Sequence, residues 1–341
     1  MQIDIIVYII YLLVTILNLV KERKIYQGLG IGLIFLLIIG SNGGVDYLST
    51  EKIYNESNFN DLKLEKFLKG DIFLYFFTYL AKKIGLTFYE FNFILTSILI
   101  LVFIRKAKNV FKLEKLNRVV GLYLLYLIFE SVIQKRNFVA LIFLLLGIME
   151  RIKKKYLKGF ILVIISYWWH SSFIIYVLMY LVSFLDRKKI LRLSKILFIF
   201  NFILIINKPI LLEVLQLFDI KKAITYVNKQ DFLNIVVIIL FFGIHFYFIQ
   251  LIKKYERKYK DNDFIIKLNY LSMILIPFYM YDIVFFRIYR NLLILNLIIM
   301  TKNNYIYRRI VIIFIILIML YYVRDFNNLI LGIFIYNKIL N

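Results

Sequence analysis

Long runs of apolar residues alternate with short charged breaks from one end of the chain to the other. Solid apolar runs are typical of helices that cross a bilayer, because ~30 Å of hydrocarbon requires ~20 mostly apolar residues. A β-barrel would show alternating apolar and polar residues instead. The pattern therefore predicts an all-α, polytopic integral membrane protein with about twelve transmembrane helices. They are expected near residues 3–20, 25–41, 88–104, 118–134, 137–150, 157–169, 171–185, 195–207, 234–252, 267–281, 287–300 and 309–323.

Two connections between the apolar runs are long, 42–87 and 208–233. Both are predicted to be extracytoplasmic loops of a single transmembrane domain that spans residues 1–341. The first contains KGDIFLYFFTYLAKKIGL, which is expected either to lie in the membrane plane as an amphipathic helix or to form a re-entrant segment. The opening stretch MQIDIIVYIIYLLV lacks the basic region of a cleavable signal peptide, so we interpret it as a retained first span.

The charged breaks separate into two groups along the chain. Alternate breaks hold most of the 44 lysines and arginines, and the positive-inside rule places those breaks in the cytoplasm and both termini outside. The formal charge of +23 is therefore interpreted as a mark of membrane orientation, and no nucleic-acid partner is predicted. The basic breaks are 21–24, 105–118, 151–158, 186–195, 253–267 and 301–309.

Composition and short motifs exclude several kinds of chemistry. The chain has no cysteine, which excludes disulfides and thiolate catalysis. No HExxH or Cys/His metal spacing occurs, so neither a metal nor a cofactor is predicted. The glycines of GLGIGL, residues 28–33, follow no strand and do not form a nucleotide loop; Gly28 and Gly32 are interpreted as a GxxxG helix-packing face.

Four polar clusters fall on the predicted outer side, where ionisable groups are costly to bury and tend to mark functional sites. Glu130, Gln134 and Asn137 would share one face if their helix continued. The two arginines of the last cluster are three residues apart and can face one target. The clusters are Asp46 with Tyr47; Glu130 with Gln134, Lys135, Arg136 and Asn137; His170 with Ser171 and Ser172; and Asp282 with Arg287 and Arg290.

Three of the four clusters also have a structural interpretation. Trp168 and Trp169 of YWWHSSF precede His170 and favour an anchor in the membrane interface. Lys135 beside Arg136 is typical of a snorkelling pair at the end of a span, and Asp46 is equally consistent with a helix cap. The second histidine, His245 in FFGIHFYF, has no polar residues beside it in the sequence and is interpreted as a packing residue.

The arrangement resembles the EpsG family, a branch of the Wzy-type polysaccharide polymerases of bacterial envelopes. Members have a glycine–Asp–Tyr stretch that opens the first long outer loop, and here it reads Gly44-Val45-Asp46-Tyr47. Their Arg-Gln before an alanine-containing span appears as Arg136-Asn137-Phe138-Val139-Ala140. Their Phe-His-x-Ser-Ala appears as Trp169-His170-Ser171-Ser172-Phe173, after the basic turn RIKKKYLKG. Arg287 matches an arginine that opens a Tyr-rich span, although Asn291 departs from the aromatic residue expected nearby.

The resemblance implies glycosyl transfer at the outer face of the bacterial cytoplasmic membrane, between oligosaccharide repeat units carried on polyprenyl pyrophosphate. It also implies a flippase and a chain-length regulator as partners, besides the bilayer itself. His170 is favoured as a pyrophosphate ligand or proton relay, and either Asp46 or Glu130 as the general base. The implied catalytic residues are His170, Asp46 and Glu130, and the implied substrate-binding residues are Arg136, Arg287, Arg290, Asn137, Tyr47 and Ser172.

Two alternatives stay open at this point. A lipid-linked glycan ligase also requires arginines at an outer-face pyrophosphate and differs from a polymerase in its acceptor. A flippase or other polysaccharide transporter would instead place ionisable residues near mid-membrane in two corresponding halves of the chain. The polar clusters here gather at one predicted face, which favours an enzyme.

Overall fold

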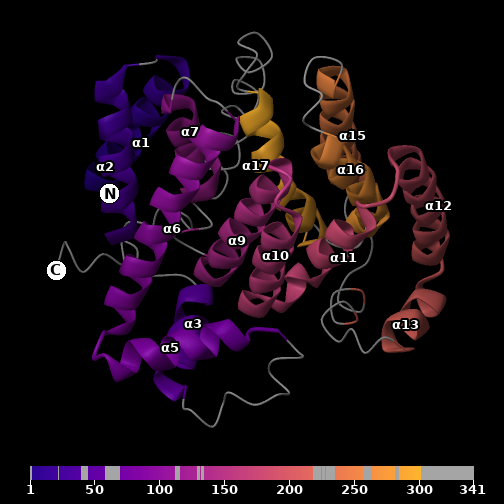
Figure 1. Cartoon of the computed structure of the whole chain (residues 1–341), viewed down its shortest axis with the longest axis horizontal. Helices are drawn as coiled ribbons and strands as arrows, with labels where there is room; N and C mark the ends of the chain where they lie inside the picture. Colours follow the sequence, from indigo (N-terminus) through magenta and orange to yellow (C-terminus); the bar gives the residue numbers. More distant parts are fainter. Residues whose placement is uncertain are drawn as a thin grey trace. The chain divides into compact units, whose positions relative to one another are not determined.

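The computed structural model shows only helices among the residues that it describes (Figure 1). These residues form two compact units. One unit runs to Val177 and includes the end of α17 from Leu297, and the other runs from Leu178 to Asn296. The all-α prediction is confirmed for this part of the chain, whereas the single-domain interpretation stays a prediction. The described residues are 2–21, 23–39, 45–57, 70–111, 116–128, 131, 134–217, 224, 227, 235–256, 263–280 and 284–300.

The first unit is built around α9 (Lys135–Ile152), which is buried along most of its length. It packs against α6, α10 and α3, and α9 and α10 lie side by side (Figure 1). Gly147 allows their close approach, since a Cβ there would lie 2.8 Å from the Gly159 carbonyl oxygen. The other elements are α1 (Gln2–Val20), α2 (Lys24–Ile39), α3 (Val45–Glu56), α5 (Ile72–Lys83), α6 (Phe88–Phe111), α7 (Asn117–Leu122), the π-helical η2 (Tyr123–Leu127), α10 (Tyr156–Trp169), η3 (Ser171–Phe173) and the start of α11 (Ile174–Val182).

The second unit has a polar centre around His245, which is 0% exposed. Its Nδ1 lies 2.9 Å from the Tyr279 hydroxyl and its Nε2 lies 2.7 Å from the Ser272 hydroxyl. The imidazole stacks on the Tyr289 ring at 3.4 Å between centroids. His245 is therefore a packing residue as predicted, but with hydroxyl partners that its apolar sequence neighbours do not indicate. The elements of this unit are α12 (Arg187–Ile206), α13 (Lys208–Leu217), α15 (Ile235–Glu256), α16 (Asp263–Ser272), η5 (Met273–Met280) and most of α17 (Val284–Met300).

Helices occupy the predicted apolar runs wherever the structure describes them. The run at 309–323 lies wholly outside the described residues, and a few other runs, such as 118–134, are described in part. Two segments of the described chain, Phe88–Phe111 and Asp263–Met280, are long and apolar enough to cross a membrane, and shorter apolar helices accompany them. The total of about twelve spans, drawn from hydropathy, stays a prediction. The expected amphipathic segment in 42–87 does form a helix, α5, although its depth in the membrane stays a prediction.

Polar contacts in the first unit join predicted cytoplasmic breaks to one another. The Asn18 side chain donates to the Tyr26 carbonyl (2.7 Å), and the Asn117 side chain donates to the Arg23 carbonyl (2.8 Å). These bonds tie the α1–α2 turn to the start of α7. Breaks 21–24 and 105–118 therefore lie at the same end of the unit.

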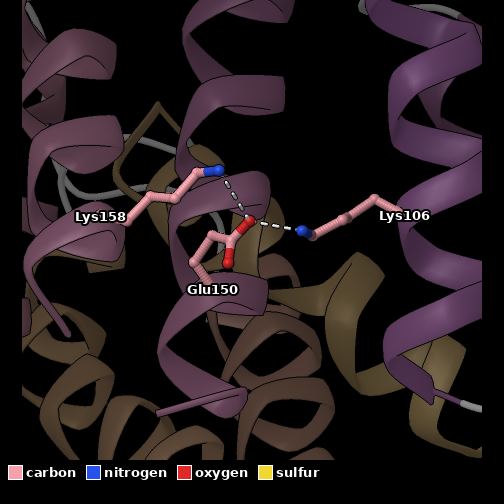
Figure 2. Close-up of polar contacts among 3 residues, drawn as sticks. All are labelled: Lys106, Glu150 and Lys158. Carbon is pink, nitrogen blue, oxygen red and sulfur yellow. Dashed lines mark hydrogen bonds and ion pairs between the residues drawn. The ribbon is translucent and has the colours of Figure 1, made fainter. Parts of the chain in front are cut away.

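Glu150 joins the next pair of breaks, as Figure 2 shows. Its side chain is 3% exposed, and Oε1 pairs with Lys106 from α6 and, at 3.7 Å, with Lys158 from α10. Breaks 105–118 and 151–158 therefore meet at this end too. Arg136 lies fourteen residues before Glu150 in α9, about 21 Å away along the helix axis at 1.5 Å per residue. The two ends of the unit thus carry different chemistry.

Candidate functional site

The candidate site is at the other end of the first unit and is centred on Asp71, immediately before α5. Oδ2 of Asp71 lies 3.8 Å from Nη1 of Arg136, in the first turn of α9. Oδ1 accepts a hydrogen bond of 3.2 Å from the backbone N–H of Ser171, which follows His170. The Asp71 and Arg136 side chains are 24% and 26% exposed, so solvent reaches the pair. One carboxylate thus brings Arg136 and the His170 turn together.

Gly70 allows this approach. Its φ of +78° is in the left-handed region, and a Cβ there would lie 2.9 Å from Cα of Ser171 and 3.0 Å from the Tyr167 carbonyl oxygen. Asp71 is also left-handed, with φ of +67°, a conformation that aspartate tolerates better than most residues. The sequence Gly-Asp therefore makes a tight turn that lies directly against the end of α10.

His170 ends α10 in an extended conformation, with φ of −154°. Its backbone N–H donates to the carbonyls of Ser166 and Tyr167, both at 3.1 Å. Its imidazole is half-buried, and Nδ1 lies 3.4 Å from the hydroxyl of the exposed Ser172. The helix end thus presents an imidazole and a hydroxyl beside the Asp71 turn, where a polar substrate could meet both.

Aromatic contacts fix α5 on α10. Phe73 packs against Trp168 with ring centroids 5.1 Å apart, and Phe77 stacks on Trp169 at 5.5 Å. Trp169 is only 2% exposed. The Trp169 ring is therefore covered by α5, and its place at the membrane interface stays a prediction. Both tryptophans of the chain report on the contact between α5 and α10.

The start of α9 differs from the sequence prediction in two respects. Gln134 is not helical (φ −115°, ψ 57°), so Gln134 and Asn137 do not share one continuous helical face with Glu130. Lys135 is 3% exposed, and burial rather than snorkelling describes its side chain. Asn137 lies beside Arg136 in the first turn of α9 and is half-buried.

The remaining predicted residues are placed less completely. Asp46 and Tyr47 lie in the first turn of α3, which packs on α5 and α9, but their side chains are outside the described part. Glu130 and Asp282 also lie outside it. Arg287 and Arg290 lie three residues apart in α17, within the second unit, and Arg290 is half-buried. Their convergence with Arg136 stays a prediction.

Sequence reasoning missed Asp71. The signal present in the sequence was weak: a single carboxylate after a glycine, at the start of the amphipathic segment IFLYFFTYLAKK. Nothing local separates this aspartate from an ordinary helix cap. Its partners are remote in sequence, and only the fold brings them to it.

The sequence matches the EpsG family over residues 25–338, nearly the whole chain. The chain belongs to the EpsG family. EpsG is a Wzy-like polymerase family, and membership suggests a polysaccharide polymerase-like role. Together with the apolar helices, it points to a membrane protein. No curated protein and no solved structure matches the chain.

The side chains of the site have chemistry that suits the binding of an anion and the transfer of a proton. Arg136 supplies a guanidinium with several N–H donors, which suits phosphate oxygens. His170 supplies a group that can bind an oxyanion or pass a proton. No group of three or more His, Cys, Asp or Glu residues suited to a metal ion occurs among the described residues. In this EpsG member, Asp71 adds the carboxylate that connects the arginine and the histidine turn.

Proposed function

We propose that this EpsG-family protein is a glycosyltransferase that joins oligosaccharide repeat units carried on polyprenyl pyrophosphate into a surface polysaccharide. The reaction takes place at the outer face of the bacterial cytoplasmic membrane. The observation that carries the proposal is the meeting of Arg136 and the His170 turn on Asp71. The segments around Arg136 and His170, which carry the resemblance to the family, meet at one end of the unit. Glu150 and its lysine partners lie at the other end, and this separation supports the proposal.

In the proposed reaction, an acceptor hydroxyl oxygen forms a bond to the anomeric carbon of the growing glycan. The bond from that carbon to the pyrophosphate oxygen breaks, and the lipid pyrophosphate leaves with the electron pair. Arg136 stabilises the charge that develops on the leaving group, because a cation already held in position favours that charge. Arg287 and Arg290 are further phosphate ligands in this proposal, and Asn137, Tyr47 and Ser172 contact the substrate.

The acceptor hydroxyl must also lose its proton to a base. Asp46 or Glu130 takes that role in this proposal, and His170 binds the pyrophosphate or relays the proton. A positioned base typically contributes about 10²–10⁴-fold to such a rate. The energy of the reaction resides in the bond between sugar and pyrophosphate, so the proposal requires no nucleotide.

The test uses purified protein in lipid with lipid-linked repeat units as the only substrate. Wild-type protein is expected to form a ladder of products that grows by one repeat unit per step. Arg136→Ala removes the leaving-group cation and should slow ladder formation about 10²–10³-fold. His170→Ala should slow it by at least about 10²-fold. Product lengths are measured by gel electrophoresis and mass spectrometry.

A matched control is Arg105→Ala, because Arg105 is exposed and lies at the predicted cytoplasmic end of α6. It should retain the wild-type ladder. Transfer of only one preformed glycan to a separate acceptor would identify a ligase instead. Unchanged ladders in both the Arg136→Ala and His170→Ala proteins would contradict the proposal.

A further inference from the structure

We propose that Asp71 is a positioning residue of the glycosyl-transfer site, which holds the Arg136 guanidinium and the His170 turn in one working arrangement. The inference rests on the proposed function. Asp71 has a partner on each carboxylate oxygen: Arg136 on Oδ2 and the Ser171 N–H on Oδ1. These partners belong to α9 and to the turn after α10, so the carboxylate connects two elements that carry site residues.

The bond to Ser171 determines where His170 lies. Ser171 is the next residue along the chain, and His170 is the extended residue between α10 and η3. The His170 carbonyl in turn accepts the N–H of Phe173 at 2.9 Å. A shift of Ser171 therefore moves the His170 backbone, and the imidazole with it. Displacement of a catalytic group by 1 Å can cost about 100-fold in rate.

The contact with Arg136 orients the guanidinium and leaves donors for a substrate. At 3.8 Å it is an ion pair rather than a short hydrogen bond. Guanidinium has five N–H donors in a fixed fork, so one such contact leaves others for phosphate oxygens. The arrangement suits a cation that must be aimed before the pyrophosphate arrives.

The negative charge of Asp71 has a second consequence. It opposes the binding of an anion beside Arg136, because like charges repel across a partly exposed site. Asp71 should therefore weaken ground-state binding of the pyrophosphate while it orients the Arg136 guanidinium. Removal of its charge should lower kcat without raising KM. A loss of folded protein would also lower the apparent kcat and leave KM unchanged, so kcat is expressed per folded molecule.

Asp71→Asn is the decisive variant. Asparagine tolerates the left-handed conformation and keeps an oxygen acceptor for the Ser171 N–H, so the variant loses the charge and the acceptor that faces Arg136. We expect kcat for ladder formation to fall about 10–100-fold, with KM for the lipid-linked unit unchanged or lower. The kcat of Asp71→Ala, which also loses the acceptor for the Ser171 N–H, should fall further. Asp186→Asn is the matched control, because Asp186 is 81% exposed and pairs with Lys189.

Tryptophan fluorescence separates positioning from misfolding. Both tryptophans lie against α5, so their emission changes if α5 leaves α10. Asp71→Asn should keep the wild-type emission spectrum while kcat falls. Wild-type kcat in Asp71→Asn, a raised KM, or a kcat loss accompanied by shifted emission would each overturn the inference.

Arg136→Ala, measured in parallel, keeps the two proposals distinguishable. If Arg136→Ala is slow and Asp71→Asn is normal, only the inference about Asp71 fails. If wild-type protein forms no polymer, or if Arg136→Ala and His170→Ala both keep the full rate, the proposed function fails as well.

Discussion

Gly70 and Gly85 have nearly the same φ, +78° and +80°, but different surroundings. Gly70 lies against the backbone of Ser171 and Tyr167, whereas a Cβ on Gly85 would meet no atom of the described residues within 4 Å. A left-handed conformation costs a residue with a Cβ about 1–2 kcal/mol at either position. Only at Gly70 does the added atom also clash with the site.

The pair gives a test at the scale of single residues. Gly70→Ala should displace the Ser171 turn from Asp71 and lower the rate of ladder formation about tenfold or more, since catalytic groups tolerate little displacement. Gly85→Ala should introduce only the backbone strain of the left-handed conformation, and its rate should stay close to that of the wild type. Rates per folded molecule, measured after size-exclusion chromatography, check this. Equal losses in the two variants would show that strain, not the contact with Ser171, explains the effect.

Residues of the site differ in how visible they are in the sequence. Arg136 and His170 interrupt apolar runs, so the cost of placing them near a bilayer marks them out. Asp71 lies in a connection where acidic residues are ordinary, and its role depends on contacts with remote segments. The burial of Trp169 could not be predicted for the same reason, because α5 packs against its ring only in the folded chain.

Helices were the most predictable elements, because apolar length is a local property that the sequence displays directly. Their packing faces were less predictable. Within the described part of the chain, a Cβ on Gly28 or Gly32 would meet nothing within 4 Å, so the predicted GxxxG face packs against no described helix. Gly30 makes the close approach instead, since a Cβ there would lie 2.6 Å from the Asn18 side chain. Spacing alone does not show which side of α2 faces α1 and α7.

The contact between α9 and α10 gives a test at the scale of elements. Gly147→Ala would place a methyl group 2.8 Å from the Gly159 carbonyl oxygen and from Val163, so the two helices must move apart. Such overpacking typically costs about 1–3 kcal/mol, and the protein should melt at a lower temperature. Gly28→Ala is the matched control and should be neutral or stabilising, by about 0.5–1 kcal/mol from helix propensity. Thermal unfolding followed by tryptophan emission measures both.

Destabilisation by Gly28→Ala, with Gly147→Ala unchanged, would contradict this view of the packing. That outcome would support the prediction that Gly28 and Gly32 form a helix-packing face. The two variants make the same chemical change in a helical glycine, so their difference reports only on what surrounds each position.

Considered as a whole, the first unit shows a consistent sidedness. Breaks 21–24, 105–118 and 151–158 meet through Asn18, Asn117 and Glu150. Segments predicted to lie on the outer side also meet, because Tyr89 donates to the Ile39 carbonyl at 2.9 Å and Tyr54 donates to the Leu86 carbonyl. The number of lysines and arginines in each break predicts which breaks lie together. It does not reveal which side chains make the contacts between them.

The direction in which the protein lies in the membrane stays a prediction, and the absence of cysteine makes it directly testable. Lys52 is exposed on α3 at the predicted outer end, and Lys153 is exposed at the predicted cytoplasmic end. In intact cells, a membrane-impermeant maleimide should label Lys52→Cys and should label Lys153→Cys only after the membrane is permeabilised. Lys189→Cys, exposed at the start of α12, should behave like Lys153→Cys.

The physical reason is that basic loops resist translocation across the membrane, and break 151–158 carries the run RIKKKYLK. Labelling of Lys153→Cys in intact cells, with Lys52→Cys protected, would reverse the orientation and place Asp71 and Arg136 on the cytoplasmic side. That outcome would rule out an outer-face polymerase even if both residues proved essential. Labelling therefore tests the location of the reaction independently of its chemistry.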